Sequence, residues 1–162
     1  RPQYEVVERL DKNVEVRQYE QQTWISTVGT TDNASFSVLA SYIFGNNKEG
    51  QNVAMTAPVI TDGTMSFILP AALSEDSAPT PNGQPIKFTT VAPRQVAALK
   101  FSWLTGSKRV EKKTEELLSV LRERGLQTQG EPFLMRYNDP WTPPFMRRNE
   151  VGIVVKNMPA AH

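Results

Sequence analysis

The sequence predicts an α+β fold: two similar βαββ halves that form a distorted eight-stranded antiparallel barrel with two main helices on the outside. Three features predict this fold. The chain contains eight short segments rich in strand-forming residues, two segments with apolar residues at helical spacing, and one order of elements that occurs twice. Its 162 residues fit one ordinary domain. We expect that domain to span residues 1–162, with pseudo-repeats at about 13–70 and 85–156.

The first half of the chain reads strand, strand, helix, strand, strand. Strand-forming residues and turn signals predict strands at Val14–Glu20, Thr23–Thr30, Val53–Ile60 and Met65–Leu69. A helix is predicted over Ala34–Phe44, because apolar residues recur there at helical spacing and Gly45 follows as a stop signal. These apolar residues are Phe36, Leu39, Ala40 and Ile43.

The second half repeats the same order of elements after a loop. The loop, Pro70–Pro85, is long and rich in proline, and loops of this length are often functional. Strands are predicted at Ile86–Val91, Gln95–Ser102, Pro132–Tyr137 and Glu150–Lys156. A helix is predicted over Ser107–Arg124, where leucines share one face and Gly125 follows as a C-terminal stop.

Composition excludes several classes of function. Lys and Arg number 18 and Asp and Glu 17, so the net charge is +1 and we expect no nucleic-acid partner. There is no cysteine, which excludes disulfides, thiolate-ligated haem and cysteine nucleophiles. The single histidine is His162, the last residue, so we expect no catalytic triad or histidine metal site.

The sequence also bears on the cellular setting. No apolar run approaches the ~20 residues that a transmembrane helix needs, so we expect a soluble protein. The sequence begins at Arg1 rather than Met, and we therefore expect a processed chain, from an organelle or exported. The sequence predicts no particular compartment or oligomeric state.

Several stretches of the chain resemble the SOUL/haem-binding-protein family. They are Tyr42–Gly45 (YIFG) leading into Val53–Val59 (VAMTAPV), Met65–Pro70 (MSFILP) and Tyr137–Val151 (YNDPWTPPFMRRNEV), with an opening of YEVV and VEVRQY at Tyr4–Val7 and Val14–Tyr19. They occur in the family's order and span almost the whole chain. The resemblance implies a duplicated βαββ barrel with two helices. It also implies that haem or a related tetrapyrrole binds in an apolar groove beside the first helix, for transport, buffering or sensing.

The resemblance suggests which side chains would line that groove. The candidate contacts are Phe36, Leu39, Ala40, Ile43, Met55, Trp141, Phe145, Arg147 and Glu150. Basic side chains at the rim, among them Lys48 and Arg147 or Arg148, would meet the propionates. Some family members are thought to ligate iron through a histidine near the first helix, which this chain lacks. We therefore expect non-covalent binding of haem, or of metal-free porphyrin, without a histidine axial ligand and driven by apolar burial.

Other interpretations of the same residues stay open. The apolar helix positions are also expected in an ordinary core, Met55 can be core filler, and Trp141 and Phe145 can clamp their own loop. Glu150 can be salt-bridged to an arginine.

The function can also be interpreted differently. A distant resemblance to gyrase-inhibitor-like effector-binding domains implies that Glu150 is a cleft carboxylate that selects a cationic ligand. The function would then be an effector-binding module for another flat hydrophobic ligand. A third alternative is a hydrolase or tetrapyrrole-modifying enzyme in which Glu150 is a general base with a raised pKa. A fourth is an interaction protein that docks a partner through its Pro-rich loops.

Overall fold

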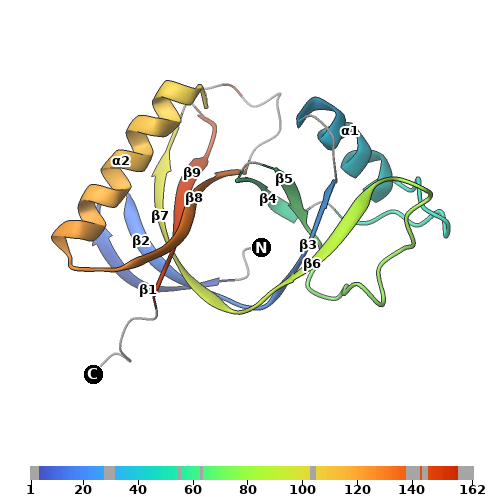
Figure 1. The fold of residues 1–162 in the computed structure, drawn as a ribbon, viewed down its shortest axis with the longest axis horizontal. Helices are drawn as coiled ribbons and strands as arrows, with labels where there is room; N and C mark the ends of the chain where they lie inside the picture. Colours follow the sequence, from blue (N-terminus) through green and yellow to red (C-terminus); the bar gives the residue numbers. More distant parts are fainter. Residues whose placement is uncertain are drawn as a thin grey trace. The chain divides into compact units, whose positions relative to one another are not determined.

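The computed structural model describes residues 4–27, 32–54, 56–62, 64–102, 105–137, 143 and 146–156. These residues form two helices and nine strands (Figure 1). In chain order they are β1 (Tyr4–Asp11), β2 (Val14–Tyr19), β3 (Gln22–Thr27), α1 (Asp32–Ile43), β4 (Thr56–Thr61), β5 (Met65–Ile68), β6 (Ile86–Val91), β7 (Arg94–Phe101), α2 (Ser107–Glu123), β8 (Thr128–Arg136) and β9 (Asn149–Val155). All pairings described between strands are antiparallel, so the predicted α+β class is confirmed.

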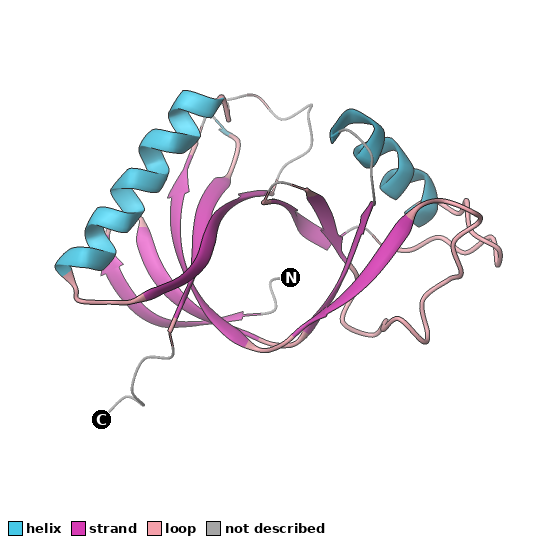
Figure 2. Cartoon of the chain, viewed as in Figure 1, coloured by secondary structure: helices cyan, strands magenta, loops and turns pink. Residues whose placement is uncertain are grey.

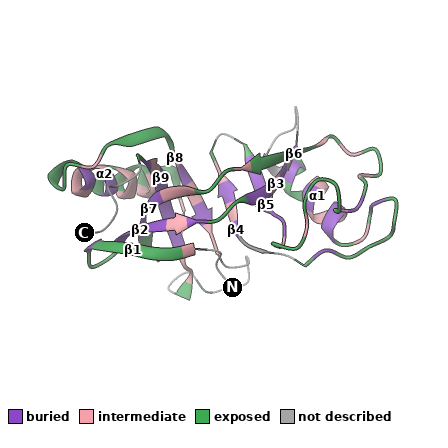
Figure 3. Cartoon of the chain, turned by 90° about the horizontal axis from the view of Figure 1, so that it is seen from below, coloured by how far each residue is buried: buried purple, intermediate pink, exposed green. Residues whose placement is uncertain are grey.

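Two details of the predicted fold are wrong. The described chain has nine strands instead of eight, because β1 precedes the predicted set. The strands also do not close into a barrel, since β1 pairs only with β2 and β6 only with β3 among the described strands. The sequence does not predict β1, because most of its side chains are exposed and they lack the alternation of apolar and polar residues typical of a half-buried strand (Figure 3).

The chain packs as two compact units. One comprises Gln21–Ala92, and the other combines Pro2–Glu20 with Pro93–His162. In the first unit the strand order is β4-β5-β3-β6, and α1 packs against β3 and β5 (Figure 1). Its core consists of Ile25, Leu39, Tyr42, Ile43, Val53, Met65, Phe67 and Leu69.

In the second unit the strand order is β1-β2-β7-β9-β8, and α2 lies over β7 and β9 (Figure 2). The face toward α2 is apolar, and its core consists of Leu10, Val14, Val16, Ala97, Leu99, Phe101, Leu117, Leu121, Val151, Ile153 and Val155. Because side chains alternate along a strand, Glu15 and Arg17 of β2 and Glu150 of β9 point to the other face. That alternation places charged side chains on a sheet face away from the helix.

Candidate functional site

The predicted site residues fall into two groups in the structure. Phe36, Leu39, Ala40 and Ile43 lie on α1 in the unit Gln21–Ala92, whereas Arg147 and Glu150 lie at and just before β9 in the other unit. The remaining three, Met55, Trp141 and Phe145, lie outside the described residues.

The inner face of α1 holds the helix on its sheet. Leu39, Tyr42 and Ile43 are buried among residues of β3 and β5. The Tyr42 hydroxyl donates a hydrogen bond of 2.5 Å to the carbonyl of Pro79, which ties the helix to the loop Pro70–Pro85. Burial raises the pKa of Tyr42, and the nearby Glu49 carboxylate adds to that rise. Leu39 and Ile43 thus belong to the core that packs α1 against β3 and β5.

One flank of α1, beside its buried face, carries an apolar stripe, and there the Phe36 ring packs on the ring of Phe67 with 5.7 Å between centroids. Phe36, Ala40 and Phe44 follow one another at a spacing of four residues, and the Phe44 N–H still donates to the Ala40 carbonyl at 3.0 Å. Residues spaced in this way share one face of a helix, and eight residues rise by about 12 Å. Phe36 is 41% exposed and Phe44 is 67% exposed, while Ala40 between them is half-buried and short. The stripe is a shallow apolar surface with an aromatic ring at each end, and we call it the α1 stripe.

The loop after α1 is fixed by its own polar side chains. The Asn47 side chain is buried and donates to the carbonyls of Tyr42 and Gln51 at 2.9 and 2.8 Å. The Glu49 carboxylate accepts hydrogen bonds from the backbone N–H and the hydroxyl of Thr80 at 2.7 and 3.0 Å. These bonds lower the pKa of Glu49. Lys48, between Asn47 and Glu49 in the sequence, is exposed, and its backbone N–H donates a hydrogen bond to the Thr80 carbonyl.

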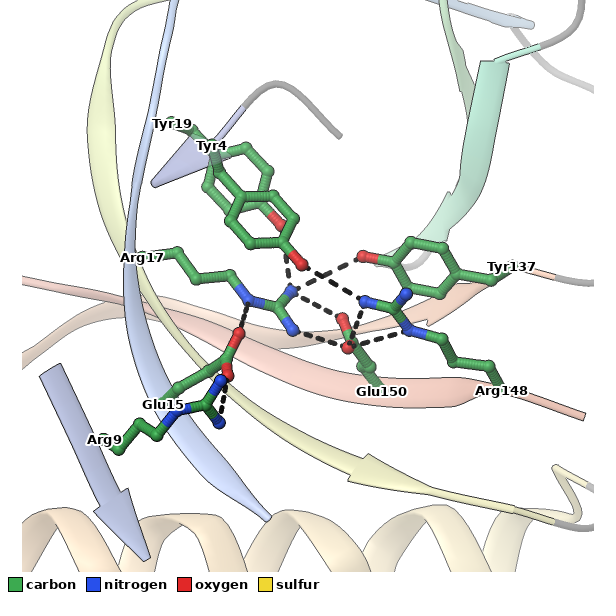
Figure 4. Close-up of polar contacts among 8 residues, drawn as sticks. All are labelled: Tyr4, Arg9, Glu15, Arg17, Tyr19, Tyr137, Arg148 and Glu150. Carbon is green, nitrogen blue, oxygen red and sulfur yellow. Dashed lines mark hydrogen bonds and ion pairs between the residues drawn. The ribbon is translucent and has the colours of Figure 1, made fainter. Parts of the chain in front are cut away.

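The second group centres on a buried ion pair between β2 and β9 (Figure 4). The two Nη groups of Arg17 donate to the two carboxylate oxygens of Glu150 at 2.6 and 2.5 Å. The Arg17 side chain is 1% exposed and that of Glu150 is 0% exposed. Arg17 also donates from Nε to Glu15 at 2.7 Å. A planar guanidinium fits a carboxylate in this two-point geometry, which an ammonium cannot reproduce.

Aromatic rings and a second arginine surround the pair. Arg17 Nη1 donates to the hydroxyls of Tyr19 and Tyr137 at 3.1 and 3.5 Å. The Arg17 guanidinium lies 4.3 Å from the centre of the Tyr4 ring, which is a cation–π distance. Arg148 stacks on Tyr137 at 4.2 Å and donates to Glu150 at 3.1 Å, so Glu150 is held by two arginines (Figure 4).

This arrangement fixes the charge of Glu150. Burial by itself would raise the pKa of the Glu150 carboxyl, but the hydrogen bonds and charge of Arg17, with the charge of Arg148, outweigh burial and hold that pKa below its ordinary value. The pKa of Arg17 is raised, since Glu150 more than offsets the cost of burial. The raised pKa expected of a Glu150 general base is therefore wrong for this structure, and the salt-bridged interpretation of Glu150 describes it.

Sequence reasoning missed most members of this cluster. Arg148 joins it, but Arg17, Tyr4, Tyr19 and Tyr137 had no assigned role. The alternation within Val14–Glu20 does place Glu15, Arg17 and Tyr19 on one strand face. Nothing in the sequence indicates that this face meets Glu150, which lies 133 positions from Arg17. Among the described residues, no group of three acidic or histidine side chains is placed to hold a metal ion.

Comparison with solved structures shows that other proteins share this fold. A hydrolase from Listeria innocua superposes with a TM-score of 0.60 at 10% identity, covering 90% of this chain and 93% of that one. The EcmrR C-terminal domain also gives 0.60, at 12% identity, covering 96% of this chain and 99% of that one. At these identities the likeness shows the fold alone.

The sequence itself defines the family. The chain belongs to the SOUL heme-binding protein family, whose sequence model matches residues 1–154. It is 26% identical to heme-binding protein 2 of Mus musculus, covering 98% of this chain and 87% of that protein. It is 28% identical to heme-binding protein 2 of Homo sapiens, covering 90% of this chain and 79% of that protein. The resemblance found in the motifs is thereby confirmed. No helix in the described part of the chain is long and apolar enough to cross a membrane.

Proposed function

We propose that the protein binds haem or a related tetrapyrrole on the α1 stripe, as a carrier, buffer or sensor. The observation that carries this proposal is the apolar flank beside the buried face of α1, where Phe36 and, just after the helix, Phe44 stay exposed. Exposed apolar patches commonly mark binding sites. Family membership supports tetrapyrrole binding for the same chain.

The energetics of the stripe suit a flat apolar ligand. Covering apolar surface gains about 25 cal/mol per Å², and aromatic rings are the largest contributors to such contacts. Ser37, Ala40 and Ser41 lie between the two phenylalanines and are short, so a planar ring system can lie along the helix without clashing with long side chains. Met55 belongs to the same unit as α1 and remains a proposed contact of this ligand, whereas Trp141 and Phe145 belong to the other unit and are not needed for this mode of binding.

The carboxylate end of a tetrapyrrole needs a cation. Within Gln21–Ala92 the basic residues are Lys48 and Lys87, and Lys48 lies four positions after Phe44. The neighbouring Glu49 already accepts two hydrogen bonds from Thr80, so its carboxylate is occupied. We assign Lys48 as the propionate contact for this reason. Arg147 and Glu150 belong to the other unit and are not needed for this mode of binding.

The iron of haem would be held without a histidine near α1, since the only histidine is His162. Tyrosine and methionine are the alternative axial ligands that the chain contains. If apolar contact dominates, metal-free porphyrin should bind with an affinity similar to that of haem. The same argument extends the proposal to other flat hydrophobic ligands of this size.

A haemin titration tests the proposal. We expect a Soret shift and saturable quenching of tryptophan fluorescence in the wild type, and an affinity roughly tenfold lower for Phe44→Ala, since about 1.4 kcal/mol of apolar burial is a factor of ten. Val7→Ala is the matched control, because Val7 is 43% exposed but lies on β1 in the other unit. An unshifted Soret band in the wild type, or equal affinities of Phe44→Ala and Val7→Ala, contradicts binding at the stripe.

An enzymatic role for Glu150 has no support in the geometry. A general base needs a free lone pair directed at a substrate proton. The Glu150 carboxylate instead accepts hydrogen bonds from Arg17 and Arg148 and is fully buried. The role proposed for this protein is therefore binding.

A further inference from the structure

The two outermost strands of the described sheets differ in how their free edges are protected. β1 carries four charged residues, Glu5, Glu8, Arg9 and Asp11, in eight positions, and its pairing with β2 is broken by two register shifts. Charges and bulges are the usual devices that prevent an edge strand from pairing with another chain. The edge of β1 is therefore protected against strand addition.

The edge of β6 has fewer of these devices. All six of its residues pair with β3 in one unbroken register. Its sequence, IKFTTV, is rich in strand-forming residues and contains one charge, Lys87. Apart from the pairing with β3, the backbone hydrogen bond described for β6 is that from the Ile86 N–H to the Gln84 carbonyl. A regular edge with a single charge can still act as a template for a further strand.

We propose that β6 pairs antiparallel with β6 of a second copy of this chain, so that the sheets of the two copies become continuous. Two antiparallel strands related by a twofold axis place residues of the same sheet face opposite each other. Opposed residues therefore have an even sum of sequence numbers. The register centred on Phe88 opposes Phe88 to its own copy, Ile86 to Thr90, and Lys87 to Thr89.

The side chains of β6 favour this occupant and this register. Phe88 lies on the face toward α1, where its ring contacts Tyr42 at 6.3 Å between centroids, so the two Phe88 rings would extend an existing aromatic cluster. On the opposite face each Lys87 meets Thr89, so the two lysines are not opposed. The strand is thus complementary to itself, and a symmetric pair requires no other partner chemistry.

The interface is small, so we expect a weak dimer that forms as the protein concentration rises. Substitutions at the Lys87–Thr89 contacts should change the affinity of the dimer, because both side chains are exposed and each contact occurs twice. Cross-strand charge pairs are worth about 0.2–1 kcal/mol each, so two changed pairs alter the dissociation constant roughly 2- to 30-fold.

Sedimentation equilibrium over a concentration series tests the proposal. Thr89→Lys opposes two lysines and should weaken the dimer roughly 2- to 30-fold, whereas Thr89→Glu should strengthen it by a similar factor. The double variant Lys87→Glu with Thr89→Lys opposes a glutamate to each lysine and should strengthen the dimer over the wild type by a factor similar to that of Thr89→Glu. Circular dichroism of each variant checks that the fold is kept.

Val7→Lys is the control, since it adds one positive charge to the exposed edge of β1 and should leave the dimer unchanged. A wild type that stays monomeric throughout the series overturns the proposal. So does equal weakening by Thr89→Lys and Val7→Lys, which would show an effect of net charge alone. Failure of the double variant to strengthen the dimer refutes the register centred on Phe88.

Discussion

Replacing Arg17 by methionine should destabilise the protein far more than removing a charge from its surface. Arg17→Met keeps most of the side-chain volume but leaves the fully buried Glu150 without its two-point partner. Breaking a buried ion pair by removing one member costs about 3–5 kcal/mol. Arg148, 3.1 Å from Glu150, compensates in part, so we expect the lower end of that range, about 3 kcal/mol.

Urea unfolding followed by circular dichroism measures this cost, and a thermal melt should show a decrease of about 6–12 °C, at about 2–4 °C per kcal/mol for a chain of this size. The matched control is Lys113→Met, which removes a charge from the surface pair between Lys113 and Glu116, 3.4 Å apart. That pair should be worth less than about 1 kcal/mol.

The double variant Arg17→Met with Glu150→Gln separates the two possible origins of the loss. If the cost comes from an uncompensated buried carboxylate, neutralising Glu150 as well should recover a large part of the stability that Arg17→Met loses. A loss below about 1 kcal/mol for Arg17→Met, or a double variant whose losses simply add, would show that the pair is not energetically coupled in the way its geometry indicates.

Three further predictions follow from other contacts. Because the pKa of Glu150 is lower in the folded state, the unfolded chain binds more protons at acidic pH. The wild type should therefore keep the stability of the ion pair above the ordinary carboxyl pKa and lose it as the pH falls through the lowered pKa. Urea midpoints measured against pH should show a smaller loss of stability in acid for Glu150→Gln. Gly152→Ala should cost about 1–3 kcal/mol in the same assay, because a Cβ there would lie 2.8 Å from Met135 Cε and 2.9 Å from Phe133 Cε2, and an unchanged midpoint would contradict this overpacking. Tyr42→Phe should cost about 1–3 kcal/mol by leaving the Pro79 carbonyl without its donor, and faster proteolysis within Pro70–Pro85 should accompany the loss if the hydroxyl holds that loop.

Local patterns identified most of the secondary structure. The helix predicted over Ser107–Arg124 is α2, Ser107–Glu123, because the leucine spacing and Gly125 mark its face and its end. The strand predicted at Ile86–Val91 coincides with β6. β1 was missed because an exposed edge strand does not need alternating apolar residues, so its sequence contains no periodic signal.

The candidate site was predictable only in part. Helical spacing and the family motifs indicated α1 and assigned Phe36, Leu39, Ala40 and Ile43 to one set. Spacing alone could not separate Leu39 and Ile43, which are buried, from Phe36, which is exposed, because the side of the helix that meets the sheet depends on β3 and β5. Phe44, the most exposed ring of the stripe, was counted as the end of a helix and not as a contact.

By itself, the sequence determined the α+β class, the order of the elements in each half and the membership in the family. It also shows that the chain has no cysteine and no histidine before His162. These properties depend on local periodicity, composition and motif order, which a single chain displays directly. Only the tertiary structure decided that Glu150 faces Arg17 and has a lowered pKa, and that β6 ends its sheet with a regular edge that carries one charge. The physical reason is that strand pairing joins residues far apart in the chain, and the energy of a buried charge depends on which partner that pairing supplies.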